Sequence, residues 1–259
     1  MKRPFILLAV LVFLTACNER TERKEGFSVH GIDVSHYQKQ VDWPLVANQG
    51  IKFAFVKATE GQSMQDTFFC QNWDATRTAG VIRGAYHFFR PGTSAAAQAM
   101  NFLATVDLQH GDLPPVLDVE VTDGLSSEAV AMGVKTWLKM VEDAWKIRPI
   151  IYSNQKFYNQ HLAGLVYDHP VWLARYTDLH KPDLADGHAW HFWQYGNRGR
   201  LNGIVGDVDF NVFNGNLNDL RNLTLCRPDP LLNRMPAPPT VPVPAPPPTE
   251  PGEPIAANP

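Results

Sequence analysis

Two acidic residues, Asp118 and Glu120, lie two positions apart in the otherwise apolar segment LDVEV at residues 117–121. In an extended strand, side chains two positions apart point to the same face, about 6.5 to 7 Å apart along the chain. Two carboxyl groups on one inward face raise each other's pKa, and the one in the drier setting can stay protonated near neutral pH. Such a pair suits the acid–base chemistry that cleaves a glycosidic bond.

A structural role for this pair is the alternative. Buried ion pairs also perturb pKa values, and the side chain of Lys57 or Arg175 could neutralise the two carboxylates. Two more aspartates favour a catalytic role, because Asp33 and Asp209 lie in the first and last strand-like segments, which would be neighbours in a closed barrel. Four carboxyl groups at one barrel mouth would be costly to bury unless the protein used them.

The elements that must position these carboxyl groups follow from the apolar pattern. Eight short runs rich in apolar and β-branched residues predict strands, which begin at Val29, Ile51, Val81, Val116, Pro149, Val171, Ala189 and Val208. Helices with Asp or Ser at most of their starts are predicted over residues 42–48, 66–79, 94–106, 126–146 and 154–162. The alternation indicates an α/β fold with a parallel sheet, and eight strands favour a closed, TIM-like barrel over an open doubly wound sheet.

In such a barrel the chemistry takes place at the carboxyl ends of the strands. Tyr152, Tyr176 and either Trp193 or Gln194 end predicted strands. Aromatic rings at these positions could stack on the flat C–H faces of sugars. Packing in the core is the alternative for any one of the aromatic residues.

Six short motifs follow one another along the chain: GIDVSHYQ at 31–38, FVKATEG at 55–61, GAYHF at 84–88, DVE at 118–120, WQY at 193–195 and VDFN at 208–211. Together, in this order and on the predicted strands, they resemble the family 25 glycoside hydrolases, the Chalaropsis-type lysozymes, from about Val29 to Phe213. The resemblance implies a single catalytic domain with an irregular (β/α)5(β)3 barrel. It also implies an N-acetylmuramidase, which hydrolyses the β-1,4 bond between N-acetylmuramic acid and N-acetylglucosamine in peptidoglycan.

The same resemblance implies a role for each acidic residue. Glu120 would be the general acid/base and Asp118 its partner, while Asp33 and Asp209 would be the remaining acidic positions. Asp118 either attacks the anomeric carbon or polarises the substrate's 2-acetamido group, which then closes on that carbon as an internal nucleophile. We favour the second scheme, because an aspartate two residues before the acid resembles the chitinase-type arrangement, and both schemes predict net retention.

Two choices at the site depend on the motifs. Asp207 lies two positions before Asp209 and would face the same way, but Asp209 begins the Asp-x-Asn step of the family and Asp207 follows a glycine that marks the start of the strand. The predicted substrate-binding set combines strand ends and motif residues: Tyr86, His87, Tyr152, Tyr176, Trp193 and Gln194.

The N-terminus has the features of a bacterial lipoprotein signal. Lys2 and Arg3 precede an apolar run from residue 5 to 14, and LTAC at 14–17 resembles the lipobox, in which the cysteine is lipidated and becomes the mature N-terminus. An ordinary secretory signal is the alternative. Because Asn18 is not the aspartate associated with inner-membrane retention, we expect a lipid anchor at Cys17 in the outer membrane, facing the periplasm.

The C-terminal tail cannot form a packed core, because eleven of the 21 prolines lie between Pro236 and Pro259. We therefore divide the chain into a signal peptide (1–16), an anchor and short linker (17–26), the barrel domain (27–226) and a disordered proline-rich tail (227–259) whose partner, if any, is unknown. Once Cys17 is lipidated, Cys70 and Cys226 remain, and one disulfide or two free thiols both fit an oxidising compartment.

The composition excludes several other functions. A net charge of −3 without a basic cluster disfavours nucleic acid, and no cofactor-binding motif is present. No metal is expected, because His188 and His191 are three positions apart and would face opposite sides of a strand. The predicted partners are peptidoglycan glycan strands and, through the lipid, a membrane. A noncatalytic peptidoglycan-binding lipoprotein on a degenerate barrel and a chitinase-like glycosidase remain the alternatives.

Overall fold

The protein is described from a computed structural model, in which residues 20–176 and 180–226 can be described. The chain divides into two compact units, Met1–Arg227 and Pro228–Pro259, and the description concerns the first of them. The predicted signal sequence with Cys17 and the predicted proline-rich tail lie outside the described residues. Among the described residues, no helix is long and apolar enough to cross a membrane.

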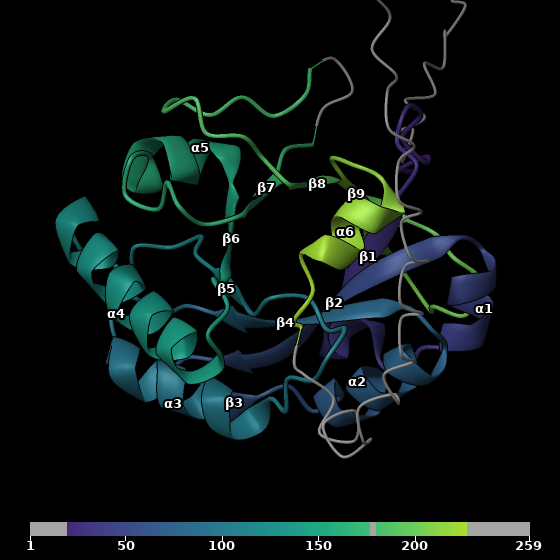
Figure 1. Cartoon of the computed structure of the whole chain (residues 1–259), viewed down its shortest axis with the longest axis horizontal. Coiled ribbons are helices and arrows are strands. Elements are labelled where there is room, and N and C mark those ends of the chain that lie inside the picture. The colour runs from purple at the N-terminus through teal and green to yellow at the C-terminus, as the bar shows by residue number, and fades with distance from the viewer. Residues whose placement is uncertain (1–19, 177–179, 227–259) are drawn as a thin grey trace, which may run out of the picture. The chain divides into compact units, whose positions relative to one another are not determined.

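Eight strands close into a barrel, as the sequence predicts (Figure 1). Their order around the barrel is β1, β2, β4, β5, β6, β7, β8, β9 and back to β1, with β9 antiparallel to both neighbours and the other pairs parallel. The strands are β1 (His30–Val34), β2 (Ile51–Glu60), β4 (Ile82–Phe88), β5 (Val116–Asp118), β6 (Ile150–Asn154), β7 (Val171–Ala174), β8 (Phe192–Gly199) and β9 (Val208–Phe213). A ninth, two-residue strand that the sequence did not predict, β3 (Met64–Gln65), pairs with the end of β2.

Helices follow the first five barrel strands and cover the outside of the barrel. They are α1 (Trp43–Asn48), α2 (Phe69–Thr78), α3 (Ala95–Thr105), α4 (Ser127–Trp145) and α5 (Gln155–Phe157), the last continued by a π-helical turn over Tyr158–Leu162. The side chains of Asp42, Ser94, Ser126 and Asn154 accept the backbone N–H groups that α1, α3, α4 and α5 leave unpaired at their starts. All five predicted helices are therefore present.

The predicted start of the second helix is wrong. It begins at Phe69 rather than near Asp66, and Asp66 has another role. One Asp66 carboxylate oxygen accepts the His36 backbone N–H at 2.9 Å, and the other accepts that of Phe68 at 3.0 Å. Asp66 therefore ties the loop after β1 to the start of α2.

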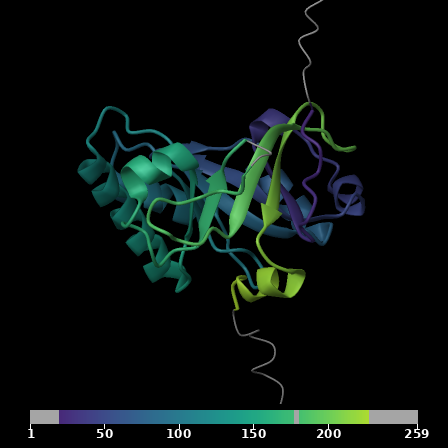
Figure 2. The same cartoon turned by 90° about the horizontal axis from the view of Figure 1, so that it is seen from above.

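The barrel interior is filled by aromatic side chains. The ring of Phe55 stacks on that of Trp172 with centroids 4.3 Å apart and meets Phe192 edge-on at 5.2 Å. Gly84 makes room for these aromatic rings, because a Cβ there would lie 2.7 Å from the Phe55 ring. A short helix not predicted from the sequence, α6 (Leu217–Asn222), lies apart from the other helices in Figure 2, and its Leu220 packs into the same interior cluster.

The outer face of β8 is covered by the N-terminal segment 20–27 instead of a helix. The Thr21 backbone N–H donates to the Arg198 carbonyl at 3.2 Å, and the Lys24 ammonium lies 4.2 Å from the centroid of the Trp193 ring. Gly196 permits this close approach, since a Cβ there would lie 2.3 Å from Thr21. Residues 20–26, which the sequence assigned to a linker, thus pack against the barrel.

The surface offers no disulfide at the predicted place. Cys70 in α2 and Cys226 at the end of the described residues are both free and exposed, so the pairing considered from the sequence is not formed.

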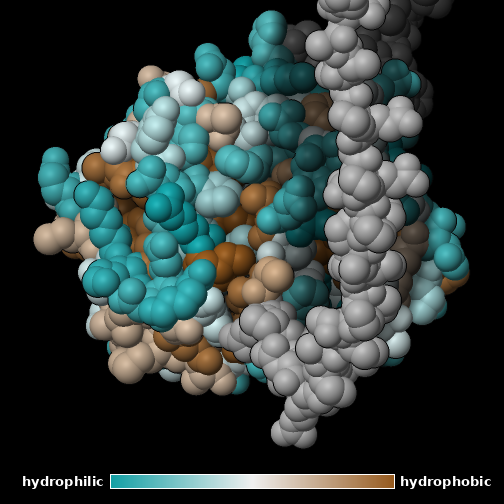
Figure 3. Space-filling view, viewed as in Figure 1, coloured by the Kyte–Doolittle hydropathy of each residue, from teal (hydrophilic) through white to brown (hydrophobic). Residues whose placement is uncertain are grey.

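The face shown in Figure 3 is mainly hydrophilic, with smaller apolar areas between the polar side chains.

Candidate active site

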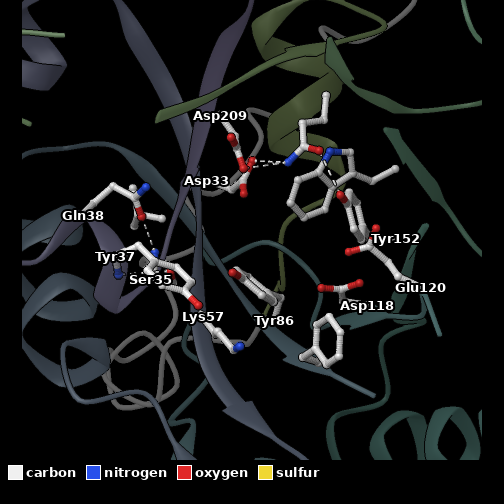
Figure 4. Close-up of a pocket in the computed structure, with 14 residues that line it drawn as sticks. Asp33, Ser35, Tyr37, Gln38, Lys57, Tyr86, Asp118, Glu120, Tyr152 and Asp209 are labelled. Atoms are coloured by element: carbon white, nitrogen blue, oxygen red, sulfur yellow. Dashed lines mark hydrogen bonds between the residues drawn. The ribbon is translucent and has the colours of Figure 1, made fainter. Parts of the chain in front are cut away.

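A pocket of about 230 Å³ opens at the carboxyl ends of the barrel strands (Figure 4). All four predicted carboxyl groups line it, so the structure brings together residues that are up to 176 positions apart in the chain. The complete lining is Asp33, Val34, Ser35, Tyr37, Gln38, Lys57, Tyr86, Phe88, Asp118, Glu120, Tyr152, Trp172, Gln194 and Asp209.

Asp118 and Glu120 face the pocket together, as strand alternation predicts. Strand β5 ends at Asp118, but Val119 continues to hydrogen-bond to β6. The Val119 N–H donates to the Tyr152 carbonyl at 2.9 Å, and the Val119 carbonyl accepts the Ser153 hydroxyl at 2.7 Å. Val119 is fully buried on the opposite face. These two bonds keep the segment extended, and the two carboxyl groups are therefore side by side.

The environment of this pair favours the protonated form. Burial and the neighbouring Glu120 carboxylate raise the pKa of Asp118 well above its ordinary value, while the Lys57 ammonium acts against this rise. Burial also raises the pKa of Glu120, although its carboxylate accepts hydrogen bonds from Asn154 and Asp118 that lower this pKa. Asp118 Oδ1 is buried and has no hydrogen-bond partner in the described structure. The pair can therefore hold a proton.

The structure does not support neutralisation of the pair by a basic side chain. The Lys57 ammonium lines the pocket but pairs with Glu60, whose carboxylate is 2.7 Å away. The Arg175 guanidinium donates to the side chain of Gln155 at 3.0 Å and lies outside the pocket. Because no ion pair joins either cation to Asp118 or Glu120, the raised pKa values of the two carboxyl groups remain.

Asp33 and Asp209 form a second pair on the opposite wall of the pocket. They are direct neighbours across β1 and β9, and their side chains share a hydrogen bond. Burial and the charge of Asp209 raise the pKa of Asp33 well above its ordinary value, and burial raises that of Asp209 to about 6. Asp207 points elsewhere, since its carboxylate lies 2.8 Å from the Arg200 guanidinium, whereas Asp209 lines the pocket.

Three predicted substrate-binding residues meet at one point between the two pairs. The Gln194 side-chain carbonyl accepts the hydroxyl groups of Tyr152 and Tyr176, each at 2.8 Å. Tyr152 and Gln194 line the pocket, whereas Tyr176 is half exposed and stands just beside it. Tyr86, also predicted, lines the pocket near Asp118 (Figure 4).

Two predicted substrate-binding residues lie on the wrong side of their strands. His87 is fully buried behind β4, where its ring nitrogens hydrogen-bond to Thr59 and Gln98 at 2.7 and 3.0 Å, and burial lowers its pKa to about 4. Trp193 is buried under the N-terminal segment and donates its indole N–H to the Arg175 carbonyl at 2.8 Å. Since neighbours on a strand face opposite ways, Tyr86 and Gln194 occupy the pocket in their place.

Several residues that lie at the site have no role predicted from the sequence. The most exposed is Tyr37, which lies in a 3₁₀ turn (His36–Gln38) directly after β1, lines the pocket and has 77% of its surface exposed. The Ser35 and Gln38 side chains cap this turn reciprocally, and His36 anchors it to Asp66 at 2.8 Å. Ser35, His36, Tyr37 and Gln38 all lie within a few residues of Asp33, directly after the end of β1. Their closeness to a predicted site residue at a strand end could have identified them.

The described residues contain no group of three or more His, Cys, Asp or Glu side chains arranged to hold a metal ion. The pocket's own groups are four carboxyl groups, one ammonium, hydroxyl groups and amides. Their chemistry is proton transfer and hydrogen bonding to a polar, sugar-sized ligand.

Comparisons with known proteins agree with this site. The model of the family described as glycosyl hydrolases family 25 matches residues 32–204. The chain is 48% identical over 201 residues to an uncharacterised protein of Escherichia coli K12, YegX (76% of this chain, 73% of the relative), and 35% identical over 205 residues to lysozyme M1 of Streptomyces globisporus (72% and 68%).

Solved structures give the same result. A family 25 glycosyl hydrolase from Bacillus anthracis superposes with a TM-score of 0.74 at 32% identity, covering 80% of this chain and 98% of that one. A bacterial lysozyme from Streptomyces coelicolor gives a TM-score of 0.73 at 33% identity, covering 77% and 98%. The resemblance seen in the sequence motifs is thereby confirmed, and this chain belongs to glycosyl hydrolases family 25 and is a glycoside hydrolase.

Proposed function

We propose that the protein is a lysozyme, an N-acetylmuramidase that hydrolyses the β-1,4 bond between N-acetylmuramic acid and N-acetylglucosamine in peptidoglycan. The observation that carries this proposal is the hydrogen-bonded Asp118–Glu120 pair in a pocket with raised pKa values for both groups. Relatives named lysozyme and N,O-diacetylmuramidase support the choice of substrate.

In this proposal Glu120 is the general acid. Burial keeps a proton available on the pair, and Glu120 is the less buried member. Glu120 donates its proton to the glycosidic oxygen as the bond to the anomeric carbon breaks, and the same carboxylate later takes a proton from the attacking water. The negative charge of the Asp33–Asp209 pair faces the sugar from the opposite wall and stabilises the positive charge that develops there.

Asp118 acts on the substrate's 2-acetamido group. The Asp118 carboxyl group lines the pocket and can accept the acetamido N–H, which orients the acetamido oxygen to attack the anomeric carbon from the face opposite the leaving group. Direct attack by Asp118 is the other scheme. Both schemes invert the carbon twice and give net retention, so an inverted first product in a proton NMR time course would contradict both.

The reducing ends of the products test the proposed bond specificity. Purified peptidoglycan is digested with the wild-type protein, the fragments are reduced with borohydride, and the reduced sugar is identified by mass spectrometry. Reduced N-acetylmuramic acid is expected. Reduced N-acetylglucosamine would instead show a glucosaminidase, and cleavage of chitin oligomers at an equal rate would favour the chitinase-like alternative. Binding without cleavage would indicate a noncatalytic peptidoglycan-binding protein.

We further propose that the protein is a lipoprotein anchored through Cys17, in the outer membrane and facing the periplasm. The support comes from the sequence: a basic start, an apolar run and the LTAC step at 14–17. An anchor of this kind would hold the enzyme beside the wall that it cleaves, because lipid-linked chains stay at the membrane surface.

A further inference from the structure

Gln194 on β8 connects the two walls of the active site. It is almost fully buried, and its side-chain amide makes hydrogen bonds at both ends. Its Oε1 accepts the hydroxyl groups of Tyr152 and Tyr176 at 2.8 Å each. Its Nε2 donates to Asp33 Oδ2 at 2.8 Å and to Asp209 Oδ2 at 3.3 Å. One amide thus contacts both acidic residues of one wall and the tyrosines beside the other.

The neighbouring groups determine which way this amide points. An amide group has one accepting end and one donating end, and a carboxylate can only accept. If the amide were turned around, its oxygen would face two carboxyl groups and repel whichever of them is ionised. The tyrosine hydroxyl groups, in contrast, can donate to the amide oxygen. The observed orientation is therefore the one in which all four contacts are favourable.

The amide also limits where the shared proton of the aspartate pair can be. Asp33 Oδ2 accepts a second amide donor, Asn211 Nδ2, at 2.7 Å. With two N–H donors directed at Oδ2, a proton on the Asp33 carboxyl must be on Oδ1. The two carboxyl groups are direct neighbours across β1 and β9, and burial favours the proton on Asp33 over one on Asp209. The pair then holds one proton and one negative charge.

We propose that Gln194 is a positioning residue that keeps the Asp33–Asp209 pair singly protonated and fixes the Tyr152 hydroxyl beside the Asp118–Glu120 pair. The use of that negative charge in stabilising a sugar cation rests on the proposed function. The protonation state itself does not, since it is a property of the protein without substrate.

Other charged and titratable groups also act on the aspartate pair and must be kept constant in a test. The Glu120 and Asp207 carboxylates raise the pKa of Asp209. Across the pocket are Asp118 from β5, Tyr86 from β4 and the Lys57 ammonium from β2. None of them forms a hydrogen bond with Gln194 in the described structure, so a substitution of Gln194 leaves them in place.

The test is a pH titration of the side-chain carboxyl carbons by ¹³C NMR, in the full protein without substrate. In Gln194→Met the two donated hydrogen bonds are lost. Because hydrogen bonds to the ionised form favour it, the titration of the Asp33–Asp209 pair should move upward by about one pH unit. Tyr176→Phe is the matched control, since it removes one partner of the same amide but no donor to the aspartates. Its titration should coincide with that of the wild type.

A second variant, Gln194→Glu, allows the test to be made if Gln194→Met does not fold. Gln194→Glu retains an acceptor for the tyrosines but adds a carboxyl group next to the pair, so the pair should again titrate at higher pH. An unchanged titration in a folded variant would overturn the proposal, as would an equal shift in Tyr176→Phe, which would indicate general loosening. The titration needs no turnover, so it can succeed even if the muramidase assignment fails.

Discussion

The four carboxyl groups of the site differ in the neighbour that each one has, although burial is the largest cause of the raised pKa in all of them. Asp118 interacts chiefly with Glu120, and Asp33 with Asp209. Two separate pairs, each able to hold a proton, suit a reaction in which one wall donates a proton while the other faces positive charge.

The pH dependence of stability should report the burial of Asp209. Its pKa is raised from 3.8 to about 6 in the folded protein, so the folded state binds the proton more tightly than the unfolded state does. This stabilisation is fully present below the unfolded value and is lost as the pH rises through the folded value. The asparagine side chain does not titrate, so the free energy of unfolding of Asp209→Asn, relative to that of the wild type, should be higher at pH 8 than at pH 4 by about 1–3 kcal/mol. Urea unfolding of both proteins at the two pH values measures this change. The prediction is contradicted if variant and wild type differ in free energy of unfolding by the same amount at pH 4 and pH 8.

The carboxyl groups that line the pocket were predictable from the sequence and some of their neighbours were not, for one physical reason. The Asp118–Glu120 prediction used strand alternation explicitly and is consistent with the structure. His87 was chosen from a motif, and Trp193 was one of two adjacent residues at a predicted strand end; in both cases adjacent residues of the strand belong to opposite faces. Their immediate neighbours Tyr86 and Gln194 face the pocket instead. Which of two adjacent residues faces inward depends on the register of the barrel, and the burial pattern reveals it only after folding.

At the scale of elements, the 3₁₀ turn after β1 presents an exposed aromatic ring to the pocket. Tyr37→Ala should raise KM by roughly tenfold or less and change kcat little, because a stacking contact of about 0.5–1.5 kcal/mol would be lost in substrate and transition state alike. Tyr167→Ala is the control, since Tyr167 is also well exposed but lies outside the pocket. Steady-state kinetics with soluble peptidoglycan fragments measure both. If kcat falls and KM stays constant, Tyr37 is not a binding platform.

The N-terminal segment 20–27 should stabilise the barrel by covering Trp193. A chain that begins at residue 28 should unfold at a lower temperature than one that begins at residue 20, and its tryptophan emission should move to longer wavelength. Each 1 kcal/mol lost corresponds to about 2–4 °C in a domain of this size. Gly196→Val provides a second variant, since its side chain would collide with Thr21 without removing the segment. Equal melting temperatures and emission spectra in all three proteins would show that the segment does not contribute.

Elements with a strong apolar pattern were predictable, and those without one were not. All eight barrel strands and five helices follow from periodicity and caps, because burial of an apolar face selects them. Strand β3, helix α6 and the segment 20–27 are short and mostly polar, and they form because the rest of the barrel provides a surface for them. The predicted start of the second helix at Asp66 was wrong for a related reason. The Asp66 carboxylate accepts the backbone N–H of His36, which lies 30 positions earlier in the chain, and does not cap the helix.

At the scale of the whole molecule, the proposed anchor makes a prediction about location. Cys17→Ser should abolish labelling by an alkyne-bearing fatty acid and move the protein from the membrane pellet to the soluble fraction, while glycosidase activity is retained. Cys70→Ser is the control, because its thiol is exposed and free but lies within the barrel domain. Fatty-acid labelling that survives in Cys17→Ser would contradict an anchor at this position.

The central claim, peptidoglycan hydrolysis with Glu120 as the proton donor, is tested most directly by the initial rate of release of reducing ends from purified peptidoglycan. Glu120→Gln keeps the shape of the side chain and removes its proton, so the rate should fall by about 10²–10⁴-fold while the melting temperature stays at or above that of wild type. Glu142→Gln, on the outer helix α4, should keep the wild-type rate. A folded Glu120→Gln protein that releases reducing ends at the wild-type rate would contradict the account.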